Sequence, residues 1–118
     1  MKRLLPLALF AALSAPVCAE SDAPVIAELM AGVAELGQVN GVALACGYPE
    51  LVTKARAMMI LRAPKTRRFG EAYETASTEA YTRQGTGGGT CPEAVVLNLK
   101  LEMTDLRLKE IAAQAGVQ

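Results

Sequence analysis

Residues 90–103 read TCPEAVVLNLKLEM, and the fold class of the chain depends on how this stretch folds. Apolar and polar residues alternate from Leu97 to Met103, which is the period of a half-buried β-strand. However, Leu, Lys, Glu and Met favour helix, β-branched residues are scarce after Val96, and the chain offers no second strand for pairing. We therefore predict a helix over residues 91–115.

The first residues of this stretch contain a helix-start signal. Thr90 and Glu93 have the spacing of a capping box, in which each side chain hydrogen-bonds a free backbone amide of the first turn. Pro92 is compatible with that position because first-turn amides have no partner within the helix. This signal predicts that the last helix starts at Cys91.

Three other segments have helical periodicity, so the sequence predicts an all-α fold, a small four-helix bundle closed by one disulfide. Gly37 is expected to end the first helix, and Pro64 ends the second because proline disfavours the helical conformation of the preceding residue. The third helix has an inner apolar stripe of Phe69, Tyr73, Ala76 and Ala80. The predicted helices cover residues 22–36, 49–63, 65–84 and 91–115, with a short helical turn near 41–47.

The N-terminus has the features of a cleaved signal peptide, residues 1–19. Lys2 and Arg3 precede an apolar run that ends at Leu13, and a small residue, Ala19, marks the cleavage position. The apolar run is too short to span a membrane, so no transmembrane segment is expected after cleavage, and residues 20–118 form a single domain. A lipid anchor on Cys18 is the disfavoured alternative because the leucine of that processing signal is absent.

The cysteine count changes with cleavage, because Cys18 leaves with the signal peptide and only Cys46 and Cys91 of the three cysteines remain. An even count in an exported protein predicts a disulfide. The predicted helices 49–63 and 65–84 have similar lengths, so an antiparallel pair returns the chain to the same end of the bundle. We therefore predict a disulfide between Cys46 and Cys91, and a periplasmic or secreted protein.

Charge and composition exclude several functions. Cleavage removes Lys2 and Arg3, which leaves ten basic against twelve acidic residues and a net charge of −2. This balance gives no general affinity for nucleic acid. The chain has no histidine, which argues against Ser-His and Cys-His nucleophiles, most catalytic zinc sites and histidine-ligated haem. We expect no cofactor, no metal site and no enzymatic activity.

Basic residues are concentrated in the middle of the chain, since residues 51–70 hold no acidic residue. Cations near the end of a helix stabilise it, which is one explanation. The other is an anionic partner, either an acidic protein face or a phosphorylated lipid headgroup. The residues of this predicted anionic-partner patch are Lys54, Arg56, Arg62, Lys65, Arg67 and Arg68.

The last predicted helix has two apolar stripes where a helix at the rim of a bundle needs only one. The first stripe is Val96, Leu99, Met103 and Leu106. The second, on nearly the opposite side, is Ala94, Leu97, Leu101, Leu108, Ile111 and Ala115. Either this helix is central and surrounded by its own chain, or the second stripe meets a homodimer partner or a client protein. We take Leu97, Leu101, Leu108 and Ile111 as the predicted partner-binding stripe.

These features together predict a periplasmic, non-enzymatic interaction protein, either chaperone-like or an accessory subunit, that binds through its last helix and its basic residues. One alternative is an inhibitor or immunity protein for an envelope enzyme, which would have a single tight partner. Another is a small-ligand carrier, which needs a deep pocket with convergent polar groups. Tyr48, Tyr73 and Tyr81 are the candidates to line such a pocket.

Overall fold

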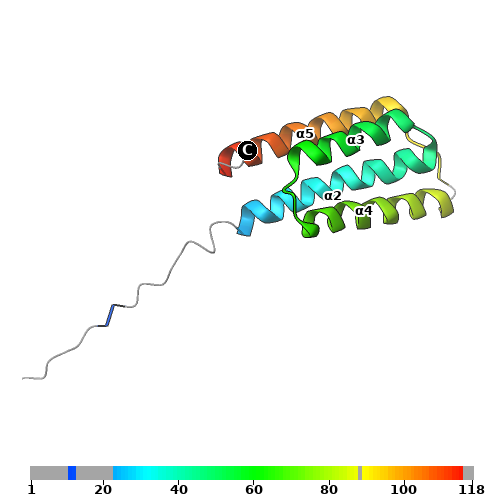
Figure 1. Ribbon diagram of the computed structural model, residues 1–118. Coiled ribbons are helices and arrows are strands. Elements are labelled where there is room, and N and C mark those ends of the chain that lie inside the picture. Colours follow the sequence, from blue (N-terminus) through cyan, green and yellow to red (C-terminus); the bar gives the residue numbers. More distant parts are fainter. Residues whose placement is uncertain (1–10, 13–22, 88, 116–118) are drawn as a thin grey trace, which may run out of the picture.

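The computed structural model describes residues 11–12, 23–87 and 89–115. Its four helices are α2 (Ala23–Cys46), α3 (Pro49–Arg62), α4 (Arg67–Thr86) and α5 (Ala94–Ala115), and no described residue belongs to a strand (Figure 1). The predicted all-α bundle is therefore confirmed. The predicted signal peptide, residues 1–19, lies outside the described residues except for Ala11 and Ala12.

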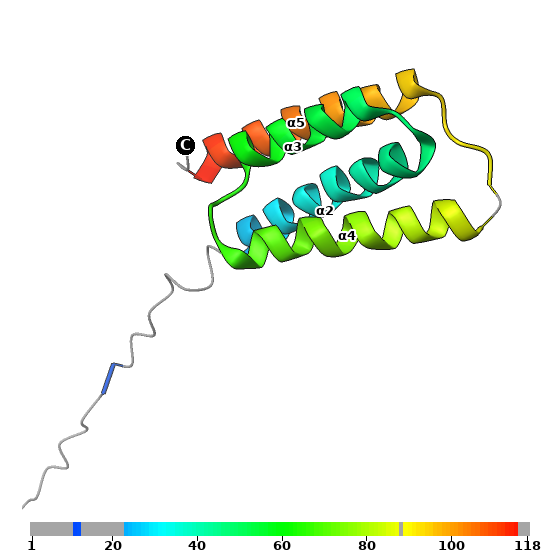
Figure 2. The same ribbon diagram turned by 45° about the vertical axis from the view of Figure 1, so that its right-hand side comes forward.

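The bundle is arranged around α2, which packs against each of the other three helices. Successive helices alternate in direction, and α3 and α5 lie side by side on one side of α2 while α4 lies on the other (Figures 1 and 2). Among the described residues only α2 is long and apolar enough to cross a membrane, but 50% of its most apolar window is buried in the bundle. This burial suits the central helix of a small domain.

The α2 helix continues through Gly37, so the predicted helix end and the separate turn at 41–47 are wrong. The reason is the packing of α4 on this face. A Cβ atom on Gly37 would lie 2.5 Å from the carbonyl oxygen of Tyr73, and one on Gly41 would lie 2.2 Å from that of Ser77. The two glycines let the α2 and α4 backbones approach closely. The packing gained by this approach outweighs the weak helix propensity of glycine.

The other helices match the predicted ones closely, and the inner stripe of α4 from Phe69 to Ala80 is buried as predicted. The predicted capping box is wrong, because α5 begins at Ala94 and not at Cys91. The amides of Val96 and Leu97 instead donate to the carbonyl of Glu93. The preceding segment has no regular secondary structure and is held by a 2.9 Å hydrogen bond from the Tyr48 hydroxyl to the carbonyl of Pro92.

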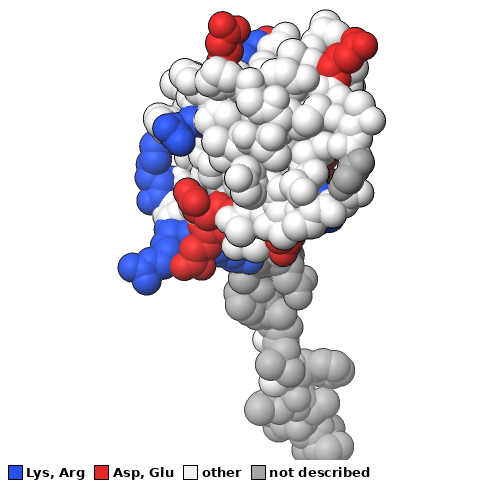
Figure 3. Space-filling model, turned by 90° about the vertical axis from the view of Figure 1, so that its right-hand side faces the viewer, with Lys and Arg blue, Asp and Glu red and all other residues white. Residues whose placement is uncertain are grey.

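The predicted disulfide between Cys46 and Cys91 is confirmed, with the two Cα atoms 5.7 Å apart and a sequence separation of 45. It joins the end of α2 to the connection between α4 and α5, because α3 and α4 carry the chain away from this end and back. Figure 3 shows that this end of the bundle is largely uncharged, with the acidic and basic side chains at its rim. The bond therefore closes a largely uncharged end of the domain.

Candidate functional site

The stripe of α5 that was predicted to bind a partner lies in the core of its own chain. Leu97, Leu101, Leu108 and Ile111 are each at most 5% exposed, packed where α5 meets α2 and α3. A Cβ atom on Gly32 would lie 2.5 Å from Leu108 Cδ2, which shows how closely α2 approaches this face. The assignment of these four residues to a partner interface is therefore corrected, and they are core residues.

The opposite stripe of α5 is the exposed one. Its side chains are between 45% and 67% exposed, although valine, leucine and methionine usually lie inside a domain. We call this surface the α5 outer stripe, and its members are Val95, Val96, Leu99, Met103 and Leu106. Because α5 packs mainly against α2 and α3 in the described part of the chain, the outer stripe faces away from them. Both stripes are present in the sequence, but the sequence does not show which of them the chain itself buries.

A groove of about 680 Å³ separates α4 from α5, because these two helices flank α2 without packing against each other. Its floor includes Val39 and Val42 of α2, and its walls include Ala80 of α4 and Leu97 and Met103 of α5. Gly87 and Gly89 of the α4–α5 connection also line it, and Gln84 Nε2 donates to the carbonyl of Gly89 at 3.2 Å. This α4–α5 groove has an apolar floor and one end formed by the connection.

The charged residues of the groove are mostly basic. The carboxylate of Glu35 faces Arg107 Nη1 at 3.3 Å and accepts a hydrogen bond from the Thr104 hydroxyl at 3.1 Å. Arg83 of α4 and Lys100 of α5 also line the groove, and no ion pair or side-chain hydrogen bond engages either of them within the described part of the chain. The groove therefore presents two cations without a counter-charge.

Three of the six residues of the predicted anionic-partner patch make contacts within the chain. Lys54 pairs with Glu102 of α5, Arg62 Nε lies 2.7 Å from Asp105 Oδ1, and Lys65 Nζ donates to the carbonyl of Ile60 at the end of α3. These contacts stabilise the α3–α5 pair and the end of α3, as expected for cations near a helix terminus. Of the six residues, Lys54 and Arg62 are neutralised by ion pairs and Lys65 donates to the end of α3, whereas Arg56, Arg67 and Arg68 are exposed and make no such contact among the described residues. Contacts within the chain therefore account for half of the patch.

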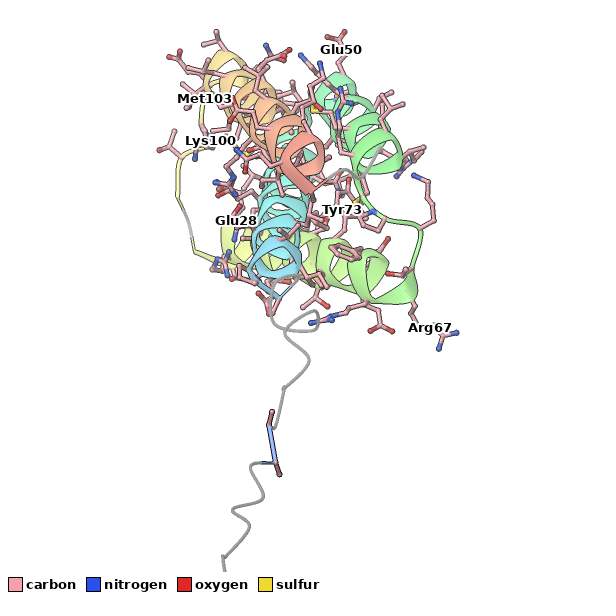
Figure 4. The ribbon with its side chains drawn as sticks, turned by 90° about the vertical axis from the view of Figure 1, so that its left-hand side faces the viewer. Glu28, Glu50, Arg67, Tyr73, Lys100 and Met103 are labelled. Atoms are coloured by element: carbon pink, nitrogen blue, oxygen red, sulfur yellow. A yellow bond between two sulfur atoms is a disulfide. The ribbon has the colours of Figure 1, made fainter. Side chains whose placement is uncertain are left out.

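The tyrosines predicted to line a ligand pocket have other positions. Tyr48 holds the segment before α5, Tyr81 is exposed, and Tyr73 lies in the core facing away from the α4–α5 groove (Figure 4). Burial raises the pKa of Tyr73 to about 12, while nearby Arg56 lowers it and Glu74 raises it by smaller amounts. The Tyr73 hydroxyl is buried and has no hydrogen-bond partner among the described residues.

Replacing Tyr73 with phenylalanine should therefore keep or raise stability at pH 7, by up to about 1 kcal/mol, because it removes an unpaired buried hydroxyl. Above pH 10.0 the unfolded tyrosine ionises while the folded one stays protonated, so the wild type should lose stability as pH rises and the variant should lose less. Urea unfolding at neutral pH and at about pH 11 measures both effects. A variant clearly less stable at neutral pH would show that the hydroxyl has a partner.

The α4–α5 groove was not predicted from the sequence, because the residues that line it come from three helices and share no motif. The sequence has no feature that separates Arg83, Gln84 and Lys100 from other polar surface residues. They line one groove because α4 and α5 leave a gap between them. Within the described ranges, no group of three or more His, Cys, Asp or Glu residues is placed to hold a metal ion. No protein-family model, curated protein or solved structure matches this chain.

Proposed function

We propose that this protein is exported to the periplasm and acts there without catalysis, by binding an apolar helix of a partner protein along the α5 outer stripe. The observation that carries the proposal is the two-sided apolar character of α5. One face is buried in the core, and five large apolar side chains on the other face remain exposed.

The size and spacing of the outer stripe favour a helix as the partner. Val95 to Leu106 span about 17 Å at 1.5 Å per residue. Val96, Leu99, Met103 and Leu106 follow the three-four spacing with which a helix packs against another helix in a coiled coil. Contiguous exposed apolar surface of this kind commonly marks an interaction site, since leaving it in water is unfavourable.

The disulfide supports an extracytoplasmic location, because such bonds form and persist in oxidising compartments. The predicted signal peptide supports export. A periplasmic protein has both features, and its partner would then be another envelope protein.

A photo-crosslinking amino acid placed at position 99 should give a specific crosslinked product in the periplasm. The same group at position 79, which is exposed on α4, serves as the matched control and should give none. Adding Leu106→Glu to the position-99 variant should reduce the product about tenfold or more, because it places a charge within the apolar contact. Leu106 is 58% exposed, so the substitution should leave the thermal unfolding midpoint nearly unchanged.

The product separates the kinds of partner. One discrete product fits an accessory subunit or an inhibitor with a single target, a ladder of products fits a chaperone with many clients, and a product of twice the monomer mass fits a homodimer. Equal crosslinking from positions 99 and 79, or a product unaffected by Leu106→Glu, would contradict binding through the α5 outer stripe.

A further inference from the structure

The α4–α5 groove is a second surface beside the α5 outer stripe and shares only Met103 with it. Figure 4 shows Lys100 and Met103 on the side of α5 from which the connection runs down to α4. The volume of about 680 Å³ lies in the range of small-molecule sites, which commonly measure about 300 to 1,000 Å³. The groove is therefore large enough for a small organic molecule.

The cations of the groove define the charge of such a molecule. Arg107 is neutralised by Glu35, and that carboxylate also accepts the hydrogen bond from Thr104. Arg83 and Lys100 have no such counter-charge among the described residues, and they come from opposite walls. An anionic group between the walls would gain charge-assisted hydrogen bonds from both side chains.

The floor defines the rest of the molecule. Val39 and Leu97 lie beneath the groove and are only 6% and 2% exposed, whereas the half-buried Val42 and the exposed Met103 present its accessible apolar surface. A purely polar anion would leave this apolar surface in contact with water, whereas a short acyl chain would cover it. Charge and apolar surface thus select the same class of ligand, an amphipathic anion.

We propose that the α4–α5 groove binds a small organic carboxylate of the medium-chain fatty acid class. Its acyl chain lies on Val42 and Met103, and its carboxylate lies between Arg83 and Lys100. This site does not depend on the proposed partner binding, because the remaining members of the α5 outer stripe do not line the groove.

Titration of the oxidised, ¹⁵N-labelled protein with octanoate, followed by NMR, tests the proposal. The amide signals of Val42 and Met103 should shift saturably, and n-octylamine, with the same chain and the opposite charge, should not produce these shifts. Arg83→Gln and Lys100→Gln should each raise the dissociation constant about five- to tenfold, as expected for loss of one charge-assisted contact. Lys109→Gln, on the exposed part of α5 outside the groove, is the matched control and should leave it unchanged.

Three results would overturn the proposal. Equal shifts with n-octylamine would show that the groove does not distinguish the charge of the ligand. Unchanged octanoate affinity in both groove variants would show that Arg83 and Lys100 do not contact the carboxylate. Shifts of the groove signals on raising the protein concentration alone would show that a second copy occupies the groove. A Leu106→Glu variant separates this site from the proposed function, since it should lose crosslinking from position 99 to the partner and keep octanoate binding.

Discussion

Replacing Gly41 with alanine should lower the free energy of unfolding by about 2 to 3 kcal/mol, even though alanine is the better helix former. The added methyl carbon would lie 2.2 Å from the carbonyl oxygen of Ser77 and 2.8 Å from the amide nitrogen of Tyr81. Both are backbone atoms of α4, so no side-chain rotation relieves the overlap. The α2–α4 pair must separate, and urea unfolding monitored by circular dichroism measures the cost.

Gly70 offers the matched control for this substitution. It also lies inside a helix, α4, but a Cβ atom there would meet nothing within 4 Å. Gly70→Ala should therefore raise the free energy of unfolding by about 0.5 to 1 kcal/mol through helix propensity alone. If the two substitutions have the same effect, the close α2–α4 approach does not contribute to stability as described.

Removing the disulfide with Cys46→Ser and Cys91→Ser together should lower the free energy of unfolding by about 4 kcal/mol. The bond closes a loop between residues 45 apart in sequence, and in the chain-entropy model opening it gives the unfolded chain that much additional freedom. A domain of this size is commonly stable by only about 5 to 15 kcal/mol, so the thermal unfolding midpoint should fall markedly.

Reduction of the wild type provides the control for the two substitutions. The reduced wild type and the double serine variant should unfold at the same urea concentration, and the oxidised wild type at a much higher one. A difference below about 1 kcal/mol between oxidised and reduced protein would mean that the four helices hold the domain without the bond.

The helix periodicity, the proline at the end of α3 and the cysteine parity were sufficient to predict the fold class and the disulfide from the sequence. The continuity of α2 was not predictable in the same way, because Gly37 is a helix-stop signal unless another backbone approaches it. That approach depends on Tyr73 and Ser77, which lie 36 residues or more further along the chain. Local patterns do not contain this information.

The candidate surfaces were predictable only in part. The sequence shows that α5 is apolar on two sides, but the side that is buried depends on which helices contact it, and α4 is not among those that pack on it. The α4–α5 groove follows from the same missing contact. Its cations, Arg83 and Lys100, are 17 residues apart and have no shared motif, so their common position is a property of the tertiary structure alone.

The number of cysteines also affects how the Cys46–Cys91 disulfide forms during oxidative folding. The full sequence has three cysteines, which allow three different pairs, and two of those pairs would include Cys18. Cleavage after Ala19 would remove Cys18 and leave one intramolecular pair. The exported chain would then reach its native disulfide in a single oxidation step, without the thiol–disulfide exchange that corrects mispaired cysteines.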